Sequence, residues 1–322
     1  IVKKLLLILL CLPLIGFGQQ TYVPDNNFEA YLENNGMGNG IPYDSSVFTS
    51  AIDTLTYLDL SFGAGTAIGF FDLTGIEDFT ALTYLNCSNN QITSLDVSSN
   101  IALIDLYCQG NQITSLDVSG ATALTTLYCQ DNQLTSLDVS SNTTLNYLHC
   151  LYNQLTSLDV SGATALTVLG CTSNQLTSLD VSNNTALTNL WCNGNQLPNL
   201  SLSQNTALTE LICNSNQLTS LDLRNGNNTN LLWFTTTENT NLSCVDVDNV
   251  AWSTANWTIA NNNIDAQHYF SNNCTSTEIE EYNSNKGILK ITDLLGRETK
   301  QTNQPLFYIY DDGTVEKRIV IE

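Results

Sequence analysis

The sequence predicts a solenoid of stacked coils, with a parallel β-sheet on one face and an irregular or short 3-10 convex side. Seven cysteines recur at intervals of 21 residues, and the same frame surrounds each one, L-x-x-L-x-C-x-x-N-Q-[LI]-T-S-L-D-V-S. The segment L-x-x-L-x-C is the strand that each copy adds to the sheet. A self-similar period of this length is typical of solenoids, in which stability belongs to the stacked array rather than to one copy. The recurring cysteines are Cys87, Cys108, Cys129, Cys150, Cys171, Cys192 and Cys213.

One complete copy of the frame contains Leu124, Leu127, Cys129 and Asn132. This frame resembles the leucine-rich-repeat frame L-x-x-L-x-L-x-x-N-x-L, with cysteine in the third apolar position. The repeat length is similar to that of bacterial internalin-like proteins, some of which also carry a cysteine column. The resemblance implies a leucine-rich-repeat solenoid.

Weaker copies flank the seven clear ones. Leu58 lies in an upstream copy, and Leu232 and Phe234 predict a further strand downstream, with Phe234 in the cysteine position. We therefore expect the solenoid to cover residues 51–247.

The cysteine column should point into the core, because it alternates with leucine along each strand. Equivalent side chains of stacked strands lie ~4.8 Å apart, whereas a disulfide prefers Cβ atoms ~3.8 Å apart. We therefore expect buried free thiols that act as small apolar side chains. Disulfides between neighbours and a metal site are the alternatives.

A column of asparagines follows the strands, at the point where the chain turns off the sheet. A side-chain amide there can bond the backbone groups that the turn leaves unpaired. In the repeat family that the frame resembles, this column is the asparagine ladder. Its members are Asn90, Asn111, Asn132, Asn153, Asn174, Asn195 and Asn216.

A column of aspartates stacks carboxylates at the same spacing, so something must offset their mutual repulsion. Serine and threonine hydroxyls or turn N–H groups are one explanation. Bridging calcium is the alternative, although there is no complete EF-hand loop. The members are Asp96, Asp117, Asp138, Asp159, Asp180 and Asp222.

Segments outside the repeats predict the remaining organisation. Residues 1–18 have the charged start, short apolar run and small residues of a secretory signal, and no later segment is apolar enough to span a membrane. Residues 19–50 should cap the first coil, with Asn26 and Glu29 forming the capping box of a helix. Residues 248–276 should cap the last coil, held by a disulfide between Cys244 and Cys274.

The candidate ligand-binding surface is the outer face of the sheet, where residues vary between copies while the frame stays constant. Aromatic side chains recur at these positions in neighbouring strands. Exposed aromatics suit sugar stacking or contacts with a protein, and cross-strand packing that only stabilises the sheet is the alternative. The candidates are Tyr84, Tyr107, Tyr128, Tyr147, His149, Tyr152, Trp191 and Trp233.

Charge and composition exclude several functions. The net charge is −22, and Arg224 is the only basic residue between positions 19 and 276, so nucleic acid is a poor partner. His149 and His268 are the only histidines, and neither H-E-x-x-H nor G-x-S-x-G occurs. The sequence therefore predicts a binding protein rather than an enzyme, with no catalytic residue and no cofactor apart from the calcium alternative.

The last residues differ in composition from the repeats. Ile291-Thr-Asp293-Leu-Leu-Gly296-Arg297 and Leu306-Phe-Tyr-Ile309 lie in alternating apolar runs that predict a small antiparallel, sandwich-like β-domain. Residues 277–322 resemble the C-terminal sorting domain of type IX secretion cargo in Bacteroidetes-type bacteria, departing from it at Phe307. The resemblance implies binding to the type IX machinery and a secreted or outer-membrane-surface location.

Two hypotheses follow for the whole chain. In the first, the variable sheet face recognises a protein or a glycan. In the second, the chain is a structural or adhesive component of a surface matrix, without a defined ligand pocket.

Overall fold

The computed structural model describes residues 18–61, 69–274, 288–292, 297–298, 305–310 and 315–319. The chain divides into two compact units, Ile1–Cys274 and Thr275–Glu322. The predicted secretory signal lies outside the described residues, except for Gly18. None of the described helices has the length and apolar character that crossing a membrane requires.

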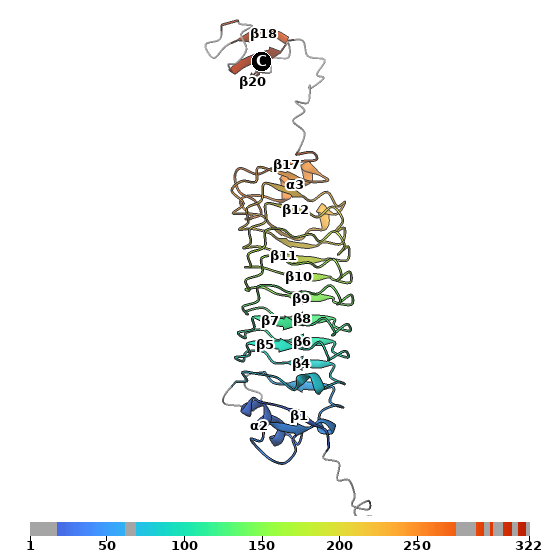
Figure 1. The fold of residues 1–322 in the computed structure, drawn as a ribbon. Coiled ribbons are helices and arrows are strands. Elements are labelled where there is room, and N and C mark those ends of the chain that lie inside the picture. The colour runs from blue at the N-terminus through green and yellow to red at the C-terminus, as the bar shows by residue number, and fades with distance from the viewer. Residues whose placement is uncertain are drawn as a thin grey trace, which may run out of the picture. The chain divides into compact units, whose positions relative to one another are not determined.

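The first unit is a stack of coils, each adding one short strand to a nine-stranded parallel sheet (Figure 1). Equivalent residues of successive copies pair in register, so that Leu127 lies beside Leu148. The prediction of a leucine-rich-repeat solenoid is thereby confirmed. The strands, in chain order, are β3 (Tyr57–Asp59), β4 (Tyr84–Asn86), β6 (Asp105–Tyr107), β8 (Thr126–Tyr128), β9 (Tyr147–His149), β10 (Val168–Gly170), β11 (Asn189–Trp191), β13 (Glu210–Ile212) and β15 (Trp233–Thr235).

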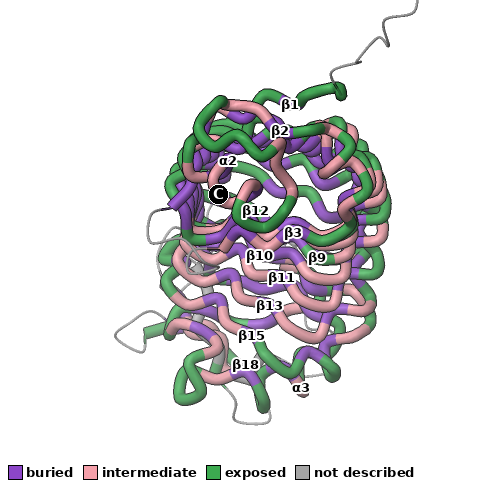
Figure 2. Tube along the Cα trace, turned by 90° about the horizontal axis from the view of Figure 1, so that it is seen from below, coloured by how far each residue is buried: buried purple, intermediate pink, exposed green. Residues whose placement is uncertain are grey.

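The core runs through the whole stack. In the seven clear copies the central leucine of the strand points inward, and the cysteine that follows two residues later is buried too, as Leu127 and Cys129 illustrate. Figure 2, which looks along the stack, shows buried stretches recurring from coil to coil between exposed outer turns. The residues on either side of the central leucine are left on the outer face, where variation costs little packing.

A second row of short parallel strands forms after the asparagine turn, in the S-L-D part of the repeat. This side was expected to be irregular or 3-10, and it contains both strands and 3-10 turns. The strands are β5 (Ser94–Asp96), β7 (Ser115–Asp117), β12 (Asn199–Ser201), β14 (Ser220–Asp222), β16 (Cys244–Asp246) and β17 (Tyr269–Ser271), and the 3-10 turns are η2 (Ile76–Asp78) and η3 (Asn228–Asn230). A further 3-10 turn, η1 (Thr49–Ala51), precedes β3.

The last strand of the sheet, β15, has a register that differs from the predicted one. Phe234 pairs with Leu211, so it occupies the central leucine position and not the cysteine position. The buried Thr236 takes the cysteine position, two residues later than the period of 21 predicts. The longer outer turn at η3 accommodates the extra residues. Leu232 is exposed, and Leu231 fills the first apolar position instead.

The N-terminal cap consists of β1 (Gln20–Tyr22), α2 (Asn26–Asn34) and β2 (Ser46–Phe48), with β1 and β2 antiparallel. The predicted capping box is wrong, because Asp25 caps the helix. One oxygen of Asp25 accepts hydrogen bonds from the backbone of Asn27 and Phe28. Its other oxygen accepts from Phe71 N, which ties the helix to the first coil. Asn26 cannot supply both contacts from inside the helix.

The C-terminal cap contains α3 (Val250–Asn256), with Asn249 as the N-cap residue, followed by β17. The second unit contains an antiparallel sheet of β18 (Ile288–Thr292), β19 (Pro305–Tyr310) and β20 (Val315–Ile319). Antiparallel pairing agrees with the small β-domain predicted for the tail.

Candidate functional site

The asparagine column supports the backbone of every coil where it leaves the sheet. The amide of Asn132 donates to Cys129 O of its own coil at 3.1 Å and to Cys108 O of the preceding coil at 3.0 Å. Its carbonyl accepts from Ile113 N at 2.9 Å. These bonds join two coils, so they fix the position of one strand relative to the next. Asn239 continues the column past the predicted members.

A second buried asparagine column was not recognised in the sequence. The amide of Asn142 donates to Val118 O and Ala121 O of the preceding coil, while its carbonyl oxygen has no partner among the described residues. Alanine replaces asparagine in two copies, so the position varies along the sequence although it is structural. Its asparagines are Asn100, Asn142, Asn184 and Asn205, and its alanines are Ala121 and Ala163.

All seven column cysteines are free and buried. Burial in the apolar interior raises the pKa of the Cys87 thiol to about 12, and the same cause raises the pKa of Cys129 well above its usual range. A protonated, inaccessible thiol is a poor nucleophile and a poor metal ligand. The seven cysteines therefore form an apolar column in the core.

The aspartate column is held by its own turns. The carboxylate of Asp138 accepts a hydrogen bond from Ser140 N at 2.9 Å, and this bond lowers the pKa of Asp138. Hydrogen bonds from Ser161 likewise lower the pKa of Asp159. Turn N–H groups therefore offset the repulsion between these carboxylates. Among the described residues, no three acidic, histidine or cysteine side chains are arranged to hold a metal ion.

The C-terminal cap is joined to the stack by a disulfide between Cys244 and Cys274, whose Cα atoms are 5.7 Å apart. Cys244 lies in β16, and Cys274 follows β17. The bridge therefore fastens the final residues of the first unit onto its penultimate small strand.

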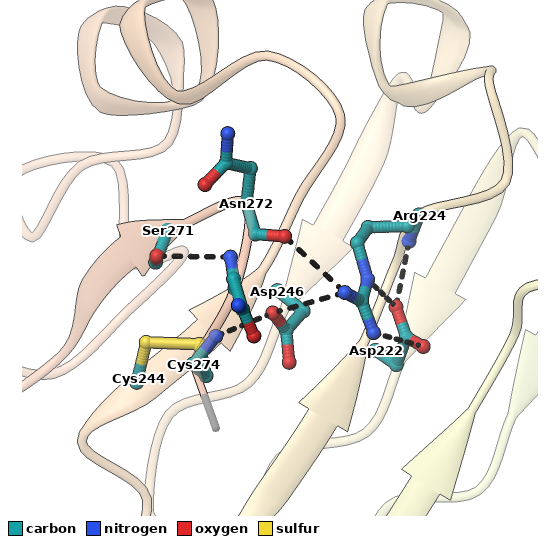
Figure 3. Close-up of a disulfide and its surroundings, with 8 residues drawn as sticks. Asp222, Arg224, Cys244, Asp246, Ser271, Asn272 and Cys274 are labelled. Carbon is teal, nitrogen blue, oxygen red and sulfur yellow. Dashed lines mark hydrogen bonds and ion pairs between the residues drawn. A yellow bond between two sulfur atoms is a disulfide. The ribbon is translucent and has the colours of Figure 1, made fainter. Parts of the chain in front are cut away.

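Arg224 lies beside this disulfide and faces two carboxylates (Figure 3). Its guanidinium contacts Asp222 at 2.8 Å and Asp246 at 3.6 Å, and it donates to Asn272 O. The hydrogen bonds from Arg224 lower the pKa of Asp222. The single basic residue of the repeats is thus engaged in a structural ion pair, which leaves the sheet face without a cation of its own.

Aromatic side chains form a continuous ladder over the outer face of the sheet. Tyr84 contacts Tyr107 with ring centroids 5.5 Å apart, and Tyr107 contacts Tyr128 at 5.1 Å. Tyr128 stacks on His149 at 4.4 Å. The sequence missed the first member, Tyr57, which stacks on Tyr84 at 4.5 Å and occupies the same strand position in the weak upstream copy.

One strand within the ladder, β10, has a glycine at the position where its two neighbours carry a ring. Gly170 lies between His149 and Trp191 in the register of the sheet. The two rings meet across it with centroids 5.3 Å apart. A Cβ at Gly170 would lie 3.2 Å from the Trp191 ring and 2.9 Å from the end of the Leu151 side chain, so a larger residue would crowd this contact.

The structure does not bring all predicted aromatics into the ladder. Tyr147 lies on the same face at the other outward position of β9, and Tyr152 lies in the turn after that strand; both are exposed. Trp233 is also exposed, but its strand position aligns with Glu210 and not with Trp191. It borders a hollow at the C-terminal cap instead.

Burial shifts the titration of ladder residues. Removal from water raises the pKa of Tyr84 and of Tyr107. The same effect lowers the pKa of His149, so its imidazole is neutral at pH 7. The ladder therefore presents an uncharged aromatic surface within an acidic chain, half-buried from Tyr84 to Trp191 and exposed at Tyr57.

Comparisons with known proteins agree with this geometry. Residues 80–120 match the family described as Leucine Rich repeats (2 copies). The comparison with curated proteins finds no match.

Three solved structures are similar to the chain. The functional domain of InlJ from Listeria monocytogenes, which includes a cysteine ladder, is 37% identical, with 71% of this chain and 52% of that one covered and a TM-score of 0.58. A leucine-rich-repeat protein of Leptospira interrogans is 21% identical over 69% of this chain and 62% of its own, with a TM-score of 0.52. Internalin C2 from Listeria monocytogenes is 23% identical over 71% of this chain and 99% of its own, with a TM-score of 0.53.

The three similarities support different conclusions. The two less identical structures show the fold alone. The chain spans about half the length of the InlJ structure, and both contain a column of cysteines. The chain thus contains leucine-rich repeats and has internalin-like structural neighbours.

Proposed function

We propose that the repeats bind a protein partner through the aromatic ladder, defined as Tyr57, Tyr84, Tyr107, Tyr128, His149 and Trp191. The observation that carries the proposal is the continuity of this ladder across strand positions that vary between copies. Leucine-rich-repeat modules typically bind protein partners. A scaffold that repeats in its core and varies on one face has the design of a recognition surface.

The ring arrangement favours a protein over a sugar at this face. Tyr57 and Tyr84 are nearly parallel, at 9°, and Tyr128 and His149 are at 7°. Their faces are therefore turned toward one another. A pyranose needs an exposed ring face to stack on, whereas the apolar and aromatic side chains of a protein can pack against ring edges as well.

Charge restricts the partner further. Asp59, Asp105 and Glu210 occupy outward strand positions next to the ladder, and Arg224 is engaged elsewhere. A complementary partner would present apolar side chains framed by lysine or arginine. Its association rate should fall as ionic strength rises.

The test uses the fluorescently labelled full chain, titrated onto intact cells of the producing bacterium. We expect saturable binding that trypsin treatment of the cells abolishes. A Tyr107→Ser, Tyr128→Ser, Trp191→Ser variant should lose that binding by at least about tenfold. The matched control is Tyr43→Ser, which removes an exposed tyrosine from the N-terminal cap.

Two results would refute the proposal. One is undiminished binding by the triple variant when its melting curve shows that it is folded. The other is concentration-dependent self-association as the only interaction, which would favour the structural matrix component.

We also propose that residues 277–322 direct export through the type IX secretion machinery to the cell surface or the medium. Support comes from the sorting-domain motif and from the separate unit Thr275–Glu322 with its antiparallel sheet. Deleting residues 277–322 should leave the protein in the periplasm. Deleting one 21-residue repeat of the solenoid should not prevent export. Surface delivery of the truncated chain would contradict this assignment.

A further inference from the structure

A hollow of about 550 Å³ lies at the end of the sheet, where the C-terminal cap covers the last strand. It is bordered by β15, by the η3 turn, by α3 and by the loop of residues 258–263. We propose that this hollow is a binding site for a neutral saccharide, separate from the aromatic ladder. Its volume is within the range of small-molecule sites.

Trp233 provides the stacking surface. Its side chain is 70% exposed, and it has no ring partner among the described residues. The ladder rings differ from it, because they contact one another. A pyranose ring exposes C–H groups on one face, and those groups pack against the π face of an indole while the hydroxyls stay at the rim.

Trp252 forms a second, rigid part of the lining. It meets Trp257 edge to face, with centroids 5.4 Å apart and an interplanar angle of 87°. Trp257 is only 3% exposed and also packs on Phe234 at 4.5 Å. Since the supporting rings are fixed in the core of the cap, the hollow is already formed and little ordering is needed on binding.

The loop of residues 258–263, beyond α3, carries polar side chains on a backbone that is held in place by hydrogen bonds. Asn262 N donates to Ile259 O at 3.0 Å, and Asn262 O accepts from the Thr235 hydroxyl at 3.1 Å. Asn263 holds the loop to the strand through a 2.7 Å bond to Phe234 O. The loop therefore presents its remaining side chains from a fixed frame.

Two of those side chains are free to meet a ligand. Asn261 and Asn262 both line the hollow, and within the described part of the chain their side-chain amides make no hydrogen bond. An amide offers both a donor and an acceptor, which matches the dual character of a sugar hydroxyl. An apolar peptide in the hollow would leave these amides unused.

The lining is uncharged, although the chain as a whole carries a net charge of −22. The described lining residues are tryptophan, phenylalanine, leucine, isoleucine, threonine and asparagine, without an acidic or basic member. A basic ligand would have no carboxylate to pair with in the hollow. An anionic polysaccharide would have no cation to pair with, and the negative charge of the surrounding chain would repel it. The chemistry matches a neutral oligosaccharide.

The experiment is calorimetric titration of the full chain with cellohexaose, laminarihexaose, mannohexaose and chitohexaose, alongside the anionic hexamannuronate. We expect saturable binding of at least one neutral probe and none of the anionic one. Trp233→Ala should weaken that binding by about tenfold or more. Asn262→Gly should weaken it as well, and glycine suits this position because its φ is 58°.

The control variant is Tyr107→Ser in the ladder, which should leave saccharide binding unchanged. Because this control tests the ladder separately, the saccharide site and the protein-binding face can succeed or fail independently. The inference is overturned if no neutral probe binds at millimolar concentration. It is overturned equally if the Trp233→Ala protein, shown to be folded by its melting curve, binds a neutral probe as tightly as the parent.

Discussion

Glu210 fixes the indole of Trp191 across two adjacent strands of the sheet. The indole Nε1 donates to one carboxylate oxygen at 2.9 Å, and Asn189 Nδ2 donates to the other at 2.6 Å. The carboxylate thus orients the last member of the aromatic ladder from the strand next to it. A buried or half-buried indole N–H needs such an acceptor.

Replacing Glu210 with alanine should release this indole. We expect a loss of about 1 kcal/mol in the free energy of unfolding and a weaker near-ultraviolet circular dichroism signal from Trp191. Glu210→Gln is the matched control, because it keeps one oxygen as acceptor and should retain most of the signal. Equal spectra for the alanine variant and the parent would show that the hydrogen bond does not orient the ring.

The two buried asparagine columns should differ in their contribution to stability. Asn132→Ala removes an amide that bonds two coils through both its nitrogen and its oxygen, and the cost should be roughly 3 kcal/mol. Asn142→Ala should cost about 1 kcal/mol, because the Asn142 carbonyl is unused and the acceptors Val118 O and Ala121 O keep backbone donors. Urea denaturation of the two variants measures the difference. Equal losses would contradict the distinction.

Much of the fold could be predicted because identical copies impose identical neighbours. Once Cys129 is placed in a buried column, in-register stacking places Cys108 and Cys150 beside it. The ladder could be predicted in part for the same reason. Tyr107 and Tyr128 share one strand position, but Tyr57 and Tyr84 occupy the other, and only the observed packing shows that the rings remain in contact.

The ends of the stack were less predictable, because there the period fails. The longer turn before β15 shifted Thr236 into the position assigned to Phe234, and Trp233 moved away from the ladder with it. The hollow beside Trp233 depends on Trp252 and Trp257, which lie in the cap, where no repeat relates them to the sheet. Residues brought together by a single loop leave no periodic signal.

The cysteine column should be inert to thiol reagents in the folded protein. Burial keeps these thiols protonated and covered, so labelling with dithiobis-nitrobenzoate should follow unfolding rather than precede it. Rapid labelling of the native chain would contradict the burial of these thiols in the core.

The same column offers a comparison between two serine substitutions. Cys129→Ser buries a hydroxyl without an evident acceptor among the described residues, and it should cost about 1–3 kcal/mol. Cys150→Ser should cost less, because the Cys150 sulfur already lies 3.4 Å from Gly170 O, which can accept from a hydroxyl. Thermal or urea unfolding would measure both variants. A smaller loss for Cys129→Ser than for Cys150→Ser would mean that hydrogen bonding does not decide the cost.

His149 should make the stability of the solenoid depend on pH. Burial lowers the pKa of its imidazole below the ordinary value of 6.5, so the unfolded chain takes up a proton before the folded chain does. The free energy of unfolding should therefore fall as pH decreases through 6.5, and this contribution should level off below the folded-state pKa.

His149→Phe keeps a ring against Tyr128 and Trp191 but cannot be protonated. Since His268 and all the carboxylates are common to both proteins, the difference in unfolding free energy between the variant and the parent isolates His149. Urea denaturation at about pH 7.5 and about pH 5.5 should show the variant gaining on the parent at the lower pH. A difference that does not change with pH would mean that the stack leaves the proton affinity of His149 unaltered.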